Sequence, residues 1–129
     1  MRKDEQKLWD TMRRRKPSSI WLQRVENVVG EGMPDVYVSD IGAWIELKAP
    51  RGTGAVLLDT SKLRQSQINW HAKAYVHQIK SYILIRTTKT GNIYLVPGEY
   101  AYAINLCTAD TAEDMSVANH WEGIWEVLT

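Results

Sequence analysis

Residues 43–49 alternate between two kinds of side chain with a period of two. One face of this segment is apolar along its whole length and is formed by Ala43, Ile45, Leu47 and Ala49. A period of two is typical of a β-strand, so we expect this apolar face to pack inward. The opposite face carries Glu46 and Lys48, at positions where a purely structural strand would have Val or Thr. The segment therefore predicts a strand that presents an acid and an amine on the same side.

A second strand is expected at residues 36–38, which follow Pro34 and are rich in β-prone side chains. A hairpin is the shortest connection between the two strands, and its register decides which face Asp35 occupies. A four-residue loop at 39–42, ending in a glycine that can take positive φ, places Asp35 opposite Glu46. A loop of three residues would turn Asp35 to the other face. We therefore expect the four-residue loop.

With that register, Asp35, Glu46 and Lys48 meet at one end of the hairpin. Carboxylate oxygens are the ligands that Mg²⁺ prefers, and a bound cation polarises a phosphate and activates water. An ammonium group beside the cation stabilises the charge that develops on the phosphate. The three side chains thus predict metal-assisted hydrolysis of phosphodiester bonds. The plain structural alternative is a turn proline followed by a surface salt bridge of little energetic value.

The pattern Pro34-Asp35, ten intervening residues, then Glu46-Leu47-Lys48 resembles the PD-(D/E)xK nuclease superfamily. The resemblance covers residues 5–97. Within the superfamily the chain is most similar to the small VRR-NUC and phage endonuclease-like members, including nucleases that resemble Holliday junction resolvases. The residues that carry this closer similarity are Gly32 before Pro-Asp, Trp44 at the start of Trp-Ile-Glu-Leu-Lys, and Gln67 with Trp70 in a Gln-x-x-Trp motif.

The resemblance implies a restriction-endonuclease-like α/β fold, with a mixed central sheet flanked by helices in the order α-β-β-β-α-β-β and one domain over residues 1–129. It implies Mg²⁺ or Mn²⁺ as the cofactor, with Asp35, Glu46 and the backbone carbonyl of Leu47 as metal ligands. Lys48 would position or activate the attacking water. Gln67 would hold that lysine or that water.

The resemblance also implies a third acid near the metal, and two residues compete for this place. A helix expected at residues 3–15 puts Glu5 on the same side as its apolar stripe, so Glu5 is one candidate ligand. An acid in a first helical turn also interacts favourably with the helix dipole, and both roles stay open for Glu5. Glu26, at the end of a strand expected at residues 20–25, could reach the site or pair locally. We expect Glu5 to matter more.

A second helix is expected at residues 64–79. Its predicted apolar face is formed by Ile68, Ala72, Tyr75, Val76 and Ile79. Relatives usually have a Ser or Thr cap three residues before the motif glutamine, where this chain has Arg64, so the cap is expected at Thr60 or Ser61. His71 is expected at the surface, packed beside the neighbouring tryptophan.

The remaining segments complete the expected fold. We expect a hairpin of strands at 82–86 and 92–96, a short helix at 99–106, a polar loop at 108–115 and a helix at 117–128. Residues 51–54 are expected to form a flexible loop whose glycine amides could approach a phosphate. The apolar run 55–58 either covers the site or forms a dimer contact, and the sequence leaves both open.

Charge is distributed unevenly along the chain. The first 89 residues hold all sixteen Lys and Arg and nine of the fifteen Asp and Glu, for a net charge of +7, whereas residues 90–129 hold six acids and no base. The half that contains the predicted site therefore has the charge of a polyanion binder. The single Cys107 excludes an internal disulfide, and no apolar run approaches membrane-spanning length, so a cytoplasmic protein is expected.

These features together predict a metal-dependent DNA endonuclease that acts on branched or structured DNA. Six Trp and six Tyr in 129 residues exceed what one small core readily hides, which favours a homodimer whose two sites address two strands. Two alternatives are a nucleic-acid-binding module that keeps the nuclease scaffold without cleavage, and a scaffold protein with a buried network of acids and lysine.

Overall fold

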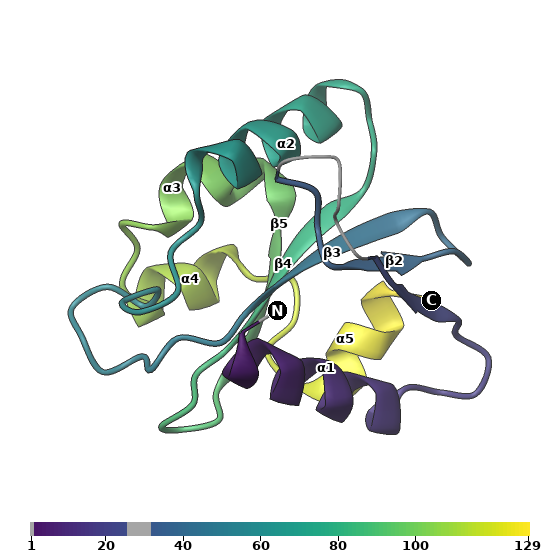
Figure 1. Cartoon of the computed structure of the whole chain (residues 1–129), viewed down its shortest axis with the longest axis horizontal. Helices are drawn as coiled ribbons and strands as arrows, with labels where there is room; N and C mark the ends of the chain where they lie inside the picture. The colour runs from purple at the N-terminus through teal and green to yellow at the C-terminus, as the bar shows by residue number, and fades with distance from the viewer. Residues whose placement is uncertain (1, 26–31) are drawn as a thin grey trace.

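The computed structural model of the chain describes residues 2–25 and 32–129 (Figure 1). Its elements, in order, are α1 (Lys3–Arg15), β1 (Leu22–Arg24), β2 (Val36–Val38), β3 (Ala43–Lys48), α2 (Gln65–Val76), β4 (Ser81–Arg86), β5 (Ile93–Pro97), the 3₁₀ turn η1 (Gly98–Tyr100), α3 (Ala101–Ile104), α4 (Ala109–Met115) and α5 (Trp121–Val127). The predicted order of the first seven elements is confirmed. Among these residues no helix is both long enough and apolar enough to cross a membrane.

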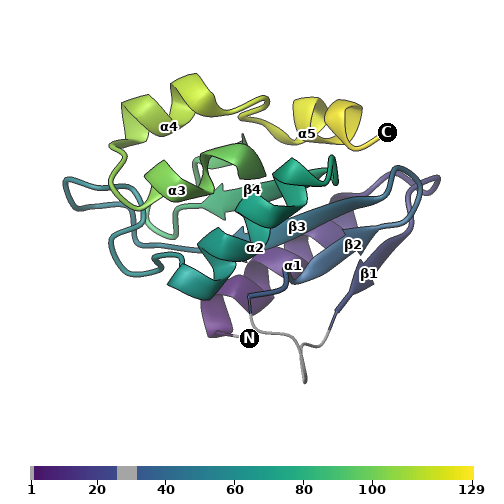
Figure 2. The same cartoon turned by 90° about the horizontal axis from the view of Figure 1, so that it is seen from above.

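The five strands form one mixed sheet in the order β1-β2-β3-β4-β5, and β4, β3, β2 and β1 follow one another across Figure 2. Neighbouring strands are antiparallel except for β3 and β4, which are parallel because α2 carries the chain back between them. The structure confirms the expected α/β class with a mixed sheet flanked by helices.

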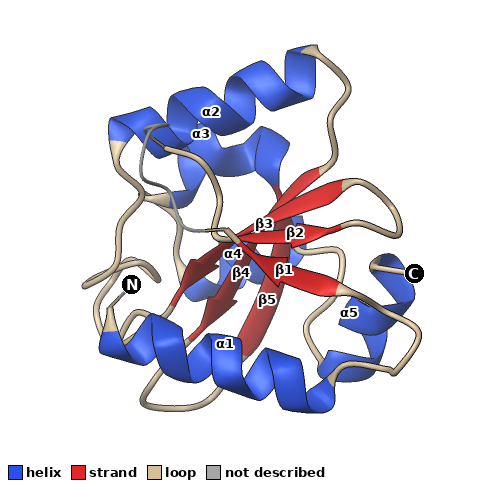
Figure 3. Cartoon of the chain, turned by 45° about the vertical axis from the view of Figure 1, so that its right-hand side comes forward, coloured by secondary structure: helices blue, strands red, loops and turns tan. Residues whose placement is uncertain are grey.

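Helices cover both faces of the sheet, with α1 and α2 on opposite sides (Figure 3). On one face, Leu8 and Met12 of α1 and Ile124 of α5 pack with Ile45 and Leu47 of β3. On the other face, a second cluster is formed by Leu57, Leu58, Leu63, Ile83, Ile85, Val96 and Ile104. The alternation predicted for β3 is confirmed. Ala43, Ile45 and Leu47 form its buried apolar face, and Glu46 and Lys48 lie buried on the opposite face.

Helix α2 differs from its prediction in its N-cap, its last turn and its buried face. Its start agrees with the predicted residue 64, but its N-cap is Arg64 rather than Thr60 or Ser61, and it ends at Val76 rather than at residue 79 because Gln78 takes a φ of +60°. The predicted apolar face is wrong, since its members Tyr75, Val76 and Ile79 are exposed. The buried face consists instead of Gln67, His71 and Ala74, which lie one helical turn apart.

The loop after β3 is held by its own carboxylate rather than flexible. The backbone amides of Gly52, Thr53, Gly54 and Thr60 all donate to the side chain of Asp59 at 2.7 to 3.1 Å. These amide hydrogen bonds hold the pKa of Asp59 at about 2 although its exposure weakens their effect on stability. The expected approach of the glycine amides to a phosphate is therefore wrong, because Asp59 already occupies them.

In the C-terminal third, two elements differ from their predictions. Residues 108–115 form α4 rather than a loop, because Thr108 caps the helix by accepting from the Thr111 amide and because Ala112 is buried. The last helix begins at Trp121 rather than at residue 117. The preceding Ala118 pairs with Leu95 as a β-bridge, and this pairing is incompatible with helix.

Candidate active site

The β2–β3 hairpin has the predicted register. Val36 pairs with Ile45 and Val38 with Ala43, so residues 39–42 form the four-residue loop, with Gly42 at a φ of +66°. The same register continued by one residue places Asp35 opposite Glu46. At this point the Asp35 amide donates to the Ile45 carbonyl, and Asp35 Oδ2 accepts from the Leu47 amide at 2.8 Å.

All five side chains that the sequence singled out line one cavity of about 540 Å³. Its wall is formed by Arg2, Glu5, Asp35, Glu46, Lys48, Lys62, Arg64 and Gln67. They come from the start of α1, from the hairpin, from the loop after β3 and from the first turn of α2. The structure thus brings together the predicted acids, lysine and glutamine. It adds three cationic side chains that the sequence analysis had not assigned to the site.

Glu46 is buried among like charges, with only 1% of its surface exposed. Burial raises the pKa of Glu46 well above its usual value, and the charge and side-chain hydrogen bond of Asp35 raise it further, whereas the Lys48 ammonium lowers it. Burial likewise raises the pKa of Glu5, which Lys48 lowers and Asp35 raises. The acids in this cavity therefore repel one another, and a divalent cation would relieve that repulsion.

Gln67 joins α2 to the acid on β3. Its Oε1 accepts from the Arg64 amide at 2.8 Å and so fixes the first turn of the helix. The side-chain amide is thereby oriented with its Nε2 donating to Glu46 Oε2 at 3.1 Å. The expectation that Gln67 holds the lysine differs from this arrangement, because the Lys48 ammonium donates instead to the Lys62 carbonyl at 3.3 Å.

His71 corrects the sequence prediction, because it is fully buried rather than at the surface. Its Nδ1 lies 2.9 Å from Ser81 Oγ, and its Nε2 lies 3.9 Å from Glu46 Oε1. Burial lowers the pKa of His71 to about 4, so the imidazole is neutral at neutral pH. The sequence signal that identifies it is its spacing, four residues after Gln67 on the same helical face.

Three motif residues outside the cavity hold α2 above the hairpin. The rings of Trp44 on β3 and Trp70 on α2 pack edge to face, with centroids 5.7 Å apart. Gly32, at a φ of +79°, lies against the first turn of α2, where a Cβ would collide with the carbonyl of Ser66. Only glycine allows this approach, so Gly32, two residues before Pro34, lets the first turn of α2 pack closely on the segment that leads to Asp35.

The backbone of Leu47 also faces the acids. In a strand, the N–H and C=O of one residue point toward the same neighbouring strand. Because the Leu47 amide reaches Asp35, its carbonyl points to the same side, where β2 begins only at Val36. The Leu47 oxygen is therefore directed to the side on which Asp35 lies.

Two carboxylates and this carbonyl form a set of hard oxygen donors that fits Mg²⁺ or Mn²⁺. Glu46 Oε1 is buried without a hydrogen-bond partner in the part of the chain that the structure describes. Within residues 2–25 and 32–129, no three His, Cys, Asp or Glu side chains form a ready-made cluster around one point. The rival acid Glu26 lies outside these residues.

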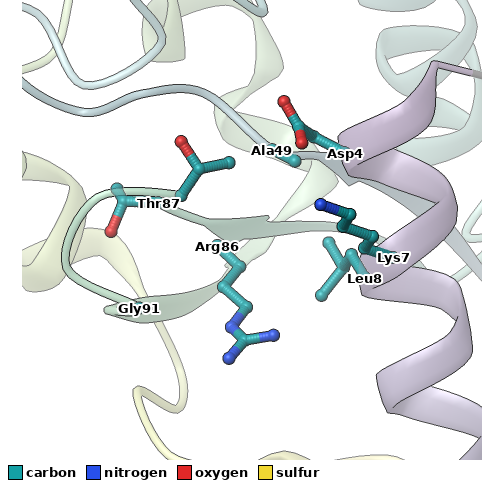
Figure 4. Close-up of a pocket in the computed structure, with 8 residues that line it drawn as sticks. Asp4, Lys7, Leu8, Ala49, Arg86, Thr87 and Gly91 are labelled. Atoms are coloured by element: carbon teal, nitrogen blue, oxygen red, sulfur yellow. The ribbon is translucent and has the colours of Figure 1, made fainter.

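A smaller hollow of about 200 Å³ adjoins this cavity on the other side of the first turns of α1 (Figure 4). Lys7 and Arg86 line it, together with Asp4, Ala49 and Thr87. Asp4 and Ala49, which line this hollow, are the chain neighbours of Glu5 and Lys48, which line the larger cavity. This arrangement places two further cations beside the carboxylate site.

Comparison with known proteins adds no family to these observations. No protein-family model matches the chain, and neither does any curated protein sequence. The resemblance to PD-(D/E)xK nucleases accordingly rests on the motif residues and on the geometry that they adopt.

The repulsion between the acids leads to a prediction about stability. A raised pKa in the folded state means that the folded protein binds more protons, so stability is lost as the pH rises above the usual value of 4.5. At pH 7.5 Glu46→Gln removes this cost while keeping an oxygen for the Gln67 amide. We expect the free energy of unfolding of Glu46→Gln to be about 1 kcal/mol higher than that of wild type, which corresponds to a melting temperature about 3 °C higher.

Thermal unfolding with and without Mn²⁺ checks this expectation. Mn²⁺ should raise the melting temperature of wild type and of the control Glu126→Gln, which changes an exposed acid on α5, but not that of Glu46→Gln. A Glu46→Gln protein that is less stable than wild type without metal would mean that the acids do not repel one another.

Proposed function

We propose that the protein is a Mg²⁺- or Mn²⁺-dependent endonuclease of the PD-(D/E)xK kind, which hydrolyses phosphodiester bonds in DNA. The main support is that Asp35, Glu46, Lys48 and Gln67 meet in one cavity. Keeping two carboxylates together in a buried site is unfavourable, so a structural role alone gives no reason for the arrangement. Cation binding does give a reason, because it neutralises both.

Each side chain of the site has a role that its contacts support. Asp35, Glu46 and the Leu47 carbonyl hold the cation, which polarises the phosphate and activates a water molecule. Among the described residues Lys48 forms no salt bridge and donates to the Lys62 carbonyl, so its ammonium keeps further N–H groups with which to orient that water and to stabilise charge on the phosphate. Gln67 keeps Glu46 in place through its amide.

The surroundings of the cavity suit a polyanionic substrate. Arg2, Lys62 and Arg64 line the cavity itself, and Lys7 and Arg86 line the adjoining hollow of Figure 4. Lys7 and Arg86 form no ion pair with any described residue. Cations on both sides of the acids would hold the phosphates that flank the cleaved bond, and binding would weaken strongly with salt.

Cleavage of supercoiled plasmid with Mg²⁺ or Mn²⁺ tests the proposal. We expect wild type to nick or linearise the plasmid, and Asp35→Ala and Lys48→Ala to lower the rate at least about 100-fold, because each removes an interaction with the reacting phosphate. Circular dichroism should show that both variants fold.

Matched controls separate catalysis from general damage. Asp114→Ala and Lys73→Ala change exposed residues of the same types on α4 and α2 and should cleave like wild type. If Lys48→Ala cleaves as fast as wild type, the activity is not that of this site. If no protein cleaves but all bind DNA, the chain is a binding module on a nuclease scaffold.

The two open roles of Glu5 can be separated with its neighbour. Asp4 lies in the same first turn of α1 but lines the adjoining hollow. Because Glu5 lines the acid cavity, we expect Glu5→Gln to lower the cleavage rate about tenfold, as for residues that support metal ligands. Asp4→Asn should cleave close to the wild-type rate. If Glu5 serves only the helix dipole, the two variants will behave alike.

We also propose that the protein works in the cytoplasm as a homodimer on branched or structured DNA. Two arguments made from the sequence do not support the dimer, because nine of the twelve Trp and Tyr are at least partly buried and because Leu57 and Leu58 lie in the core. A different surface does support it. Exposed Tyr75, Val76 and Ile79, at the end of α2, line a groove of about 600 Å³ together with Val117.

Light scattering at micromolar concentration tests the dimer. We expect a mass of twice 14.8 kDa for wild type, and a monomer for Val76→Glu, since a buried charge disrupts an apolar interface. Leu106→Glu, an equally exposed apolar position outside the groove, should remain dimeric. A wild-type mass of 14.8 kDa, with equal cleavage of linear and four-way DNA, would contradict both the dimer and the substrate preference.

A further inference from the structure

The buried face of α2 is polar where it crosses the acids. Gln67 and His71 lie one turn apart, and both face Glu46 on β3. A fully buried imidazole is costly unless its nitrogens are hydrogen-bonded, and a Leu of similar volume would pack there without that cost. The presence of histidine at this position calls for a role in the site.

The two atoms that face each other across this contact both lack a partner. Within the described residues, His71 Nε2 and Glu46 Oε1 are buried without a hydrogen bond, and they lie 3.9 Å apart. The other atom of each group is already engaged: His71 Nδ1 by Ser81 Oγ at 2.9 Å, and Glu46 Oε2 by Gln67. A shift of about 1 Å would bring the two unpartnered atoms to hydrogen-bond distance.

Ser81 determines which tautomer can make that bond. If the Ser81 hydroxyl donates to Nδ1, the single proton of the neutral imidazole resides on Nε2 and points at Glu46. In the opposite tautomer, a lone pair would face the carboxylate oxygen. Gly98 leaves the space for this pair, because a Cβ there would collide with Ser81 Oγ and lie 2.8 Å from His71 Nδ1.

We propose that His71 is a positioning residue, which holds Glu46 Oε1 through Nε2–H while Gln67 holds Oε2. The two donors fix the rotation of the carboxylate and so set the direction in which it meets a divalent cation. This inference rests on the proposed function, since it assigns Glu46 to cation binding. Outer-shell partners of this kind typically change metal affinity 10- to 100-fold when they are removed.

Metal binding by the protein alone tests the inference without DNA. We expect His71→Leu, which keeps the volume and removes the donor, to weaken Mn²⁺ binding in calorimetry about tenfold. His71→Gln, which restores a donor, should recover most of the affinity. His77→Leu changes an exposed histidine just after the same helix and should bind like wild type. The Mn²⁺ concentration for half-maximal cleavage should follow the same order.

The tautomer of His71 gives a second, metal-free measurement. The ¹⁵N shifts of the imidazole should show the proton on Nε2 in wild type. A proton on Nδ1 in wild type overturns the inference, and so does a His71→Leu protein that melts lower but binds Mn²⁺ like wild type. If wild type binds Mn²⁺ without cleaving DNA, the nuclease proposal fails. The role of His71 as a positioning residue is still tested in that case, by the effect of His71→Leu on Mn²⁺ affinity.

Discussion

The contact between Asp35 and Glu46 is the constraint on which the rest of the site depends. Burial of Glu46 and the charge of the half-buried Asp35 both raise the pKa of Glu46, so the surrounding elements must compensate for the repulsion between the two acids. Three nearby groups compensate, two from β3 itself and one from α2. The Leu47 amide holds Asp35, the Gln67 amide holds Glu46, and the Lys48 ammonium offsets the charge of both. The hairpin register is the feature that makes all three contacts possible.

The sequence predicted the acid end of the site because the signal there is local. Strand β3 has one apolar face, so its period of two is clear, and the loop of residues 39–42 fixes the partner of Glu46. The polar wall of the site was not predictable in the same way. Helical periodicity finds buried apolar residues, whereas α2 buries Gln67 and His71 and exposes Tyr75 and Val76. The face of α2 that packs on the sheet is therefore its polar face, and part of its apolar face is exposed to solvent.

The remaining errors concern contacts between distant segments. The bridge between Ala118 and Leu95 shortens the last helix, although residues 117–128 alone resemble one helix. The pairing of His71 with Ser81 requires both the end of α2 and the start of β4 to be placed. The same holds for Asp59, whose four amide partners are ordered only once the loop has closed. Such contacts depend on tertiary structure and leave no periodic signal in the sequence.

The parallel pairing of β3 with β4 has a consequence for the order in which the site is built. The β2–β3 hairpin joins residues close in sequence, so it can form early, whereas β3 and β4 meet only after the whole α2 crossover is in place. We therefore expect the two acids to come together during folding before Gln67 and His71 can reach them. In the finished protein, α2 is bounded by loops, and its local opening would separate both donors from Glu46 while the sheet stayed intact. The proposed cation affinity would thus depend on the free energy of local opening of a single helix rather than on the global stability of the fold.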